Sequence, residues 1–338
     1  MKAADFRPWP GLRNAHVQSL LASSGLRRRL FGRRRAALDR AAKEVILDCG
    51  DGVRLQGYYS RQKTAPESRG LVILLHGWEG SVLSSYVLNT GARLLDEGFD
   101  LFRLNFRDHG ATHHLNRGIF HSCRIDEVVG AVGAIADRYP QRPLAIAGFS
   151  LGGNFALRVA LRAPAARIPL SCVLAVSPVI SPPACLEAIE NAPWFYQRYF
   201  MRKWRESLKR KQAVFRDGEL FTRAELNGNL RELTRSLVLR HTDFGSLENY
   251  LDGYSIAGNR LAALTVPATL LTAVDDPIIP IADFADLKLP RCAELEIAAH
   301  GGHCGFIGNY ALHSWSEDFV AERLQRHMRI ASLRMRNA

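Results

Sequence analysis

The chain of 338 residues lacks the features that would assign it to a special class of protein. No stretch reaches the ~18 consecutive apolar residues of a membrane-spanning helix, and there is no low-complexity tract or clear internal repeat. The six cysteines are scattered, with neither a C-x-x-C pair nor the spacing of zinc ligands. We therefore expect a globular protein without a disulfide framework, metal or cofactor, in a reducing, cytoplasmic setting.

Acidic residues are scarce at the N-terminal end of the chain. Residues 1–40 contain ten Lys or Arg against two Asp, which gives them a net charge of +8 out of +12 for the whole chain. The remaining residues are nearly balanced in charge. The basic character therefore belongs to an N-terminal arm, for which we predict residues 1–44.

Residues 27–35 of this arm read R-R-R-L-F-G-R-R-R. Paired arginines before a phenylalanine resemble a twin-arginine export signal, but no apolar segment follows them, so we reject a cleaved signal. We favour a solvated arm that wraps the core. Nucleic acid is not expected as a partner, because aromatic residues do not alternate with the arginines as a single-strand-binding surface requires. Peripheral contact with an anionic membrane remains the alternative.

Short apolar segments alternate with segments of helical periodicity along most of the chain. Such runs suit strands that are buried on both faces, and strand–helix repeats with short loops imply a mostly parallel sheet covered by helices. The predicted strands are residues 45–49, 54–59, 71–75, 101–105, 144–147, 172–176, 268–272 and 293–298. The predicted helices on either side of them are residues 83–97, 125–139, 154–161 and 313–328.

The strand pattern is interrupted between residues 181 and 258. Apolar side chains recur there at every fourth position from Tyr196 to Leu208, with arginines and lysines between them, as in a basic amphipathic helix. Residues 222–225 form a capping box that starts another helix. We predict a helical cap over 181–258, inserted between the first part of the core, 45–180, and the second part, 259–338. We explain this aromatic stripe, the row of side chains at every fourth position, by packing on the core. A lipid-like substrate would also suit such a surface.

Residues 148–153 read G-F-S-L-G-G and lie between a predicted strand and a predicted helix. In that context the G-x-S-x-G pattern indicates a nucleophile elbow, which exposes the hydroxyl of Ser150 at a sharp turn. Gly148 and Gly152 keep side chains away where backbone segments crowd, and the helix N-terminus favours developing negative charge. The pattern alone is weak evidence, because the two glycines could also serve an ordinary turn.

Three further motifs follow predicted strands: His76-Gly77, Asp275-Asp276 and His303. In a parallel sheet such strand ends meet at one edge. A serine hydroxyl needs a base within hydrogen-bond reach, and that base needs an acid to orient it. We therefore predict that Ser150 is the nucleophile, that His303 is the general base and then the general acid, and that an aspartate orients the histidine.

The choice between neighbouring candidates rests on local backbone arguments. Pro277 pushes the preceding residue towards an extended conformation, so we choose Asp276 as the orienting acid, while Asp275 remains the alternative. His303 is preferred to His300 because it lies in a glycine-rich loop, and we treat Cys304 beside it as a packed cysteine.

The tetrahedral intermediate of such a reaction needs hydrogen-bond donors for its oxyanion. The backbone N–H groups of Leu151 and Trp78 are the predicted donors, while His76 is expected to hold the loop.

Four histidines, His109, His113, His114 and His121, fall in a short loop region. A metal site is conceivable, but no acidic or cysteine partner completes a ligand set, and we do not predict one. Whether this loop binds anything is left open by the sequence.

Taken together, these motifs resemble the YheT-like branch of the α/β-hydrolases. The resemblance implies an α/β-hydrolase fold with esterase or monoacylglycerol-lipase-like activity, and it supports Ser150, Asp276 and His303 as a triad. This sequence departs from the branch at Asp108-His109-Gly110 and at Trp78, so substrate choice is not carried over. The resemblance is carried by residues 14–20, 75–81, 105–107, 148–154, 275–277 and 300–306.

Two hypotheses follow. The first is a serine hydrolase that cleaves carboxylic esters, short-chain or monoacyl lipid-like, through an acyl-enzyme. The second is a non-catalytic binding module on the same fold, anchored to a membrane or a partner by the basic arm.

Overall fold

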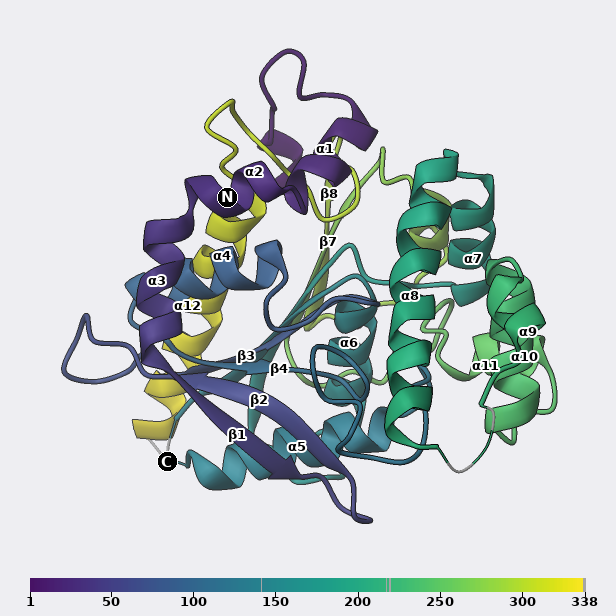
Figure 1. Ribbon diagram of the computed structural model, residues 1–338. Helices are drawn as coiled ribbons and strands as arrows, with labels where there is room; N and C mark the ends of the chain where they lie inside the picture. Colours follow the sequence, from purple (N-terminus) through teal and green to yellow (C-terminus); the bar gives the residue numbers. More distant parts are fainter. Residues whose placement is uncertain (141, 217, 219, 337–338) are drawn as a thin grey trace.

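The computed structural model describes residues 1–338 except 141, 217, 219, 337 and 338. Its centre is an eight-stranded sheet in the order β1-β2-β4-β3-β5-β6-β7-β8 (Figure 1). β1 and β2 form an antiparallel hairpin at one edge, β2 pairs with β4 antiparallel, and the other pairs are parallel. The strands are β1 (Ala42–Asp48), β2 (Arg54–Ser60), β3 (Leu71–Leu75), β4 (Asp100–Leu104), β5 (Leu144–Phe149), β6 (Leu170–Val176), β7 (Ala268–Ala273) and β8 (Ala293–Ala298).

The apolar runs explain this sheet. Every residue of β3, β4, β5 and β7 is buried, as expected for parallel strands that are covered on both faces. The predicted fold, a mostly parallel α/β-hydrolase sheet with helices on both faces, is therefore confirmed.

Two large hydrophobic clusters form most of the core, one on each face of the sheet. α5 (Ile125–Arg138) and α6 (Leu151–Arg162) pack on one face through residues such as Val128 and Phe155. α4 (Ser85–Asp96) and α12 (Trp315–Arg336) cover the other face through residues such as Leu94 and Phe319. The sheet thus lies between two layers of helices. The ends of its strands are not covered by these layers and can carry functional side chains.

The N-terminal segment packs on the core as η1 (Ala3–Asp5), α1 (Ala15–Ala22), α2 (Gly25–Leu30) and α3 (Gly32–Ala41). The prediction of a solvated arm is wrong for two arginines of the basic run. Arg27 is buried in an ion pair with Glu317, and the Nε of Arg35 donates a hydrogen bond to the Oδ1 of Asn89 at 2.7 Å. The side chains of Arg33 and Arg34 lie outside what the structure describes.

Among the described residues, five helices lie between β6 and β7, beside the sheet (Figure 1). The longest of them buries Trp204 and Leu208 of the predicted stripe, together with Lys211. The capping box predicted at residues 222–225 is present, with Thr222 and Glu225 hydrogen-bonded to each other. The helices are α7 (Pro182–Asn191), α8 (Trp194–Val214), α9 (Arg223–Asn227), α10 (Leu230–His241) and α11 (Leu247–Gly253).

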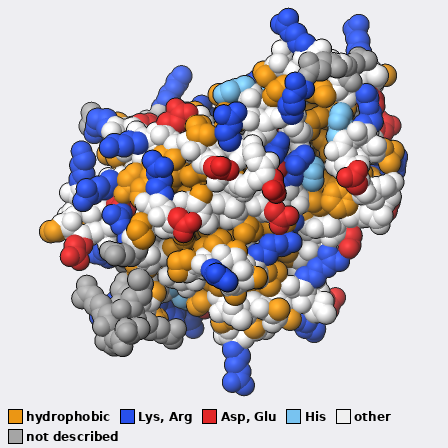
Figure 2. Space-filling view, turned by 90° about the horizontal axis from the view of Figure 1, so that it is seen from below, with side chains coloured by type: hydrophobic (Ala, Val, Ile, Leu, Met, Phe, Trp, Pro, Cys, Tyr) orange, Lys and Arg blue, Asp and Glu red, His pale blue; other side chains and the backbone are white. Residues whose placement is uncertain are grey.

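Lysine and arginine side chains are spread over the face shown in Figure 2 and do not gather in one patch there. In the described part of the chain, no helix combines the length and the apolar character needed to cross a membrane.

Candidate active site

Ser150 lies at the sharp turn between β5 and α6. Its backbone has a φ of +54° and a ψ of −121°, a conformation that L-residues rarely adopt, and its N–H donates to the carbonyl of Val176 at 2.9 Å. The flanking glycines are required by close backbone approaches. A Cβ at Gly148 would overlap the carbonyl of Gly152, and a Cβ at Gly152 would overlap the carbonyls of β3 and His76.

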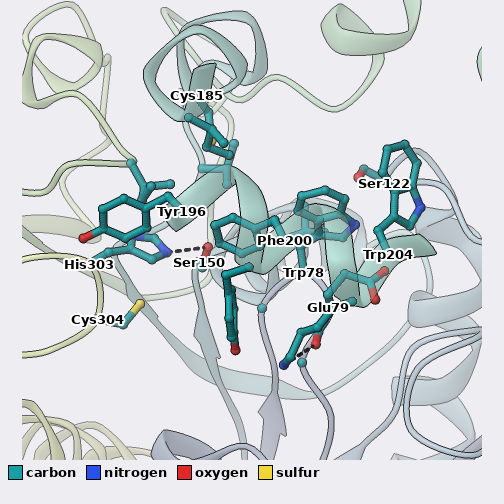
Figure 3. A pocket seen from close by; sticks show the side chains of 18 of the residues that line it. Trp78, Glu79, Ser122, Ser150, Cys185, Tyr196, Phe200, Trp204, His303 and Cys304 are labelled. Atoms are coloured by element: carbon teal, nitrogen blue, oxygen red, sulfur yellow. Dashed lines mark hydrogen bonds between the residues drawn. The ribbon is translucent and has the colours of Figure 1, made fainter. Parts of the chain in front are cut away.

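Three side chains form a hydrogen-bonded chain at this turn, and Figure 3 shows the bond between Ser150 and His303. The hydroxyl of Ser150 lies 2.9 Å from Nε2 of His303, and Nδ1 of His303 lies 3.0 and 3.1 Å from the two carboxylate oxygens of Asp276. The carboxylate can only accept, so Nδ1 carries the proton and Nε2 is free to accept from the serine. In this arrangement His303 can take the proton of the Ser150 hydroxyl.

The two neighbouring aspartates lie in different surroundings. The carboxylate of Asp276 is fully buried and its Oδ1 accepts the N–H groups of Ile278 and Ile279 at 2.9 and 3.0 Å. Asp275 instead accepts the N–H of Gly302 at 2.9 Å and lies 3.4 Å from Nδ1 of His300. The structure therefore brings Asp276, and not Asp275, to His303.

The loop after β3 approaches Ser150 closely. A Cβ at Gly77 would lie 3.2 Å from the Cβ of Ser150. The N–H groups of Trp78 and Leu151 have no hydrogen-bond partner among the described residues, whereas the N–H of Gly77 donates to the hydroxyl of Tyr86 at 3.0 Å. Both predicted donors are therefore unengaged within the described residues, and their role stays a prediction.

His76 holds this loop and does not reach the serine. Its Nε2 accepts the N–H of Phe106 at 3.2 Å and its Nδ1 lies 2.8 Å from the carbonyl of Gly77. Full burial shifts the pKa of His76 well below its ordinary value, so the ring stays neutral.

Helix α1 holds the loop that carries His303 through hydrogen bonds, a contact that the sequence did not predict. The hydroxyl of Ser19 accepts the N–H of His303 at 2.8 Å, and the side-chain carbonyl of Gln18 accepts the N–H of Ile307 at 2.5 Å. A Cβ at Gly302 would overlap the carbonyl of Ala15, so only glycine lets the helix sit this close. The only signal in the sequence was the resemblance of residues 14–20, which assigned them no role.

A cavity of about 520 Å³ opens in front of Ser150 and His303. Its walls come from α1, the loop after β3 and the helices between β6 and β7. Aromatic rings form one wall: Trp78 stacks on Phe200 with 5.4 Å between ring centroids and meets Trp204 edge-on (Figure 3). Such a cavity can hold an apolar ligand with a few polar groups.

Two side chains of the histidine loop, those of His109 and His113, are hydrogen-bonded within the protein. Nδ1 of His109 lies 2.8 Å from the carbonyl of Arg107, and Nε2 of His113 lies 2.9 Å from the hydroxyl of Ser207 on α8. Burial lowers the pKa of His109 and that of His113 to about 4. Across the part of the chain that the structure describes, no group of three or more His, Cys, Asp or Glu is placed to hold a metal ion.

Cys304 follows His303 but is buried, with its Sγ 3.7 Å from the carbonyl of Val176. Burial raises the pKa of its thiol, which leaves it without a reactive thiolate.

Comparison with known proteins agrees with the fold described above. A sequence profile described as the alpha/beta hydrolase fold matches residues 70–310. The putative esterase YheT of Escherichia coli (strain K12) is 26% identical over 340 residues, which cover 98% of this chain and 96% of that protein. A pimeloyl-[acyl-carrier protein] methyl ester esterase of Nitrosomonas europaea is 27% identical, over 74% of this chain and 92% of its own length. Among solved structures, the esterase Pf2001 of Pyrococcus furiosus shares the fold, with a TM-score of 0.56, 19% identity, and coverage of 85% of this chain and 93% of that one.

Proposed function

The chain belongs to the α/β-hydrolase fold family, in its YheT-like branch, and on that premise we propose that it is a serine hydrolase that cleaves carboxylic esters. The observation that carries the proposal is the hydrogen-bonded chain from Ser150 through His303 to Asp276, beside two free N–H groups and an apolar cavity. A pure binding module would have no need of all three side chains, which argues against the non-catalytic hypothesis.

The proposed reaction has two halves. The Oγ of Ser150 attacks the ester carbonyl while Nε2 of His303 takes its proton, and the oxyanion accepts hydrogen bonds from the N–H groups of Trp78 and Leu151. The intermediate collapses to an acyl-enzyme, and the alcohol leaves with the proton from His303. Water then attacks the acyl group with His303 again as base, which releases the acid and restores Ser150. Asp276 keeps Nδ1 protonated and stabilises the imidazolium.

The walls of the cavity support esters with one apolar chain, short-chain or monoacyl, as substrates. Val179, Leu186 and Ile189 line the cavity together with the aromatic wall, and a volume of about 520 Å³ suits one chain better than several. The two proteins compared by sequence are also named as esterases, one of them a methyl ester esterase.

A series of p-nitrophenyl esters from acetate to palmitate tests the proposal. Hydrolysis should be measurable for at least one chain length and should be lost in Ser150→Ala. If the wild-type protein hydrolyses no member of the series, or if Ser150→Ala hydrolyses the series as well as the wild type, the proposal fails.

We also propose that the mouth of the cavity contacts an anionic membrane surface. Leu20 and Tyr199 line the cavity yet are 53% and 41% exposed, and Trp194 at the start of α8 is 73% exposed. The exposed Arg28 lines the cavity as well and would meet acidic lipid headgroups. A cytoplasmic location remains part of the proposal, since all six cysteines are unpaired.

A further inference from the structure

Two side chains in the cavity carry polar groups that the proposed reaction does not use. Glu79 comes from the loop after β3, directly after Trp78, and Lys203 comes from α8. No described residue makes a hydrogen bond or an ion pair with the carboxyl group of Glu79. In Figure 3, Glu79 and Trp204 lie to one side of Ser150, and His303 lies to the other.

The backbone of Glu79 is held in an unusual conformation that fixes the direction of its side chain. Its φ is +53°, in the left-handed region that favours glycine. Its N–H donates to Nε2 of His109 at 3.2 Å, and its carbonyl accepts the ammonium of Lys203 at 3.1 Å. Both hydrogen bonds fix the position of the Glu79 peptide, and Glu79 is one of the residues that line the cavity.

Lys203 is held close to Glu79 without pairing with it. Its ammonium lies 4.8 Å from the centre of the Tyr199 ring and donates to the Glu79 carbonyl, but no carboxylate oxygen of the described residues lies within ion-pair distance of it. The two groups still interact through space, because Lys203 opposes part of the rise in the pKa of Glu79. Glu79 and Lys203 thus both line the cavity, and their side chains form no ion pair with each other.

Burial raises the pKa of Glu79 to about 8. At neutral pH the carboxyl group of Glu79 is therefore mostly protonated, and it can both donate and accept a hydrogen bond. The ammonium of Lys203 can only donate. A ligand group that pairs with both side chains must accept a hydrogen bond from the ammonium. It must also donate a hydrogen bond to the carboxyl group or accept one from it.

We propose that Glu79 and Lys203 form a polar subsite that binds a hydroxyl group of the ester substrate. The hydroxyl oxygen accepts from the ammonium of Lys203, and its proton is donated to the carboxyl group of Glu79. An ammonium on the substrate would be repelled by Lys203, and a carboxylate would lose its hydration in an apolar cavity. The inference rests on the proposed ester hydrolysis, and it narrows the substrates to esters that carry a free hydroxyl away from the ester bond.

Matched pairs of esters test the subsite. In one pair the alcohol part varies, 3-hydroxypropyl butyrate against butyl butyrate. In the other the acyl part varies, ethyl 6-hydroxyhexanoate against ethyl heptanoate. The readout is the ratio of kcat/KM within a pair, because the ratio cancels general damage to the loop that carries Trp78. We expect the wild type to prefer the hydroxylated member of one pair by about tenfold or more.

Four variants complete the design. Glu79→Met and Lys203→Met keep the length of the side chain without its polar group and should bring the ratio close to one. Glu79→Gln keeps a neutral donor and acceptor and should retain most of the preference. Lys209→Met, on the exposed side of the same helix, is the matched control and should leave both the ratio and the rates unchanged. If Glu79→Met does not fold, Lys203→Met still decides the outcome.

Three results would overturn the subsite. One is a wild-type ratio near one for both pairs, and another is a preference that survives in Lys203→Met. The third is a stronger preference for monoethyl adipate than for either hydroxylated ester, which would identify a carboxylate subsite. In each case the esters would still be hydrolysed, so the subsite would fail while the proposed function stands. Absence of any Ser150-dependent hydrolysis would overturn both.

Discussion

The hydroxyl of Ser19 accepts a hydrogen bond from the backbone N–H of His303 at 2.8 Å, across 284 residues of the chain. Helix α1, which carries Ser19, also contacts α8, since Nδ1 of His16 lies 3.2 Å from the hydroxyl of Tyr196. Ser19 and Leu20 of the same helix line the cavity. The N-terminal segment is therefore a structural part of the site, in addition to being a carrier of positive charge.

Removal of the Ser19 hydroxyl should slow the chemical step. Ser19→Ala loses the acceptor for the His303 N–H, and one such hydrogen bond is worth about 1 kcal/mol, so kcat should fall roughly fivefold with KM nearly unchanged. Ser19→Thr keeps the hydroxyl and should retain most of the activity. Steady-state kinetics of the three proteins on one ester provide the check. A kcat for Ser19→Ala equal to that of the wild type would show that the hydrogen bond does not position His303.

The two aspartates should differ sharply in their effect on catalysis. Asp276→Asn should reduce kcat by about 10³- to 10⁴-fold, because the amide cannot hold the tautomer of His303 that accepts from Ser150. Among the described residues Asp275 contacts Gly302 and His300, and Asp275→Asn keeps an oxygen that can accept the Gly302 N–H, so its effect should stay within about tenfold. Similar losses in the two variants, or a larger loss in Asp275→Asn, would reverse the assignment of the orienting acid.

Acid should destabilise the protein through its buried histidines. Burial lowers the pKa of His113 to about 4, below its ordinary value of 6.5. The unfolded chain therefore binds the proton first, and the stabilisation is complete above pH 6.5 and is lost as the pH falls towards 4. Between pH 7 and pH 5, His113 alone should account for about 2 kcal/mol of the free energy of unfolding.

Urea unfolding at the two pH values measures this effect. His113→Asn should lose less stability than the wild type between pH 7 and pH 5. The exposed neighbour provides the control, since His114→Asn should follow the wild type. If both variants lose as much stability as the wild type, His113 is not the source of the acid sensitivity.

Membrane contact should depend on the exposed apolar side chains at the cavity mouth. Binding to phosphatidylcholine vesicles that contain phosphatidylglycerol should exceed binding to pure phosphatidylcholine and should weaken at high salt. Trp194→Ser should reduce binding several-fold, since it removes a large apolar side chain from the interface. Ile330→Ser, near the C-terminal end of α12, is the matched exposed control. Equal binding to both vesicle types, or equal loss in the two variants, would argue against this surface.

The sequence predicted the sheet and the elbow well because their signals are local. Parallel strands buried on both faces leave continuous apolar runs, and the elbow needs glycines at fixed distances from Ser150. The argument from Pro277 also selected Asp276, the aspartate that lies against His303.

The contacts that the sequence could not predict join distant segments. Nothing near Ser19 indicates that it meets His303, and nothing near Lys203 indicates that it meets the carbonyl of Glu79. The charge of Arg27 suggested exposure, whereas the structure pairs it with Glu317 in the interior. Such pairings depend on how helices pack, which the local pattern does not specify.

Covalent labelling of Ser150 tests the central claim most directly. A fluorophosphonate reacts with a serine that an adjacent base activates, and intact-mass and peptide analysis locate the adduct. The account predicts one adduct, on Ser150, that is absent in Ser150→Ala and strongly slowed in a His303→Ala variant. A wild-type protein that remains unlabelled, or an adduct that persists in Ser150→Ala, would contradict it.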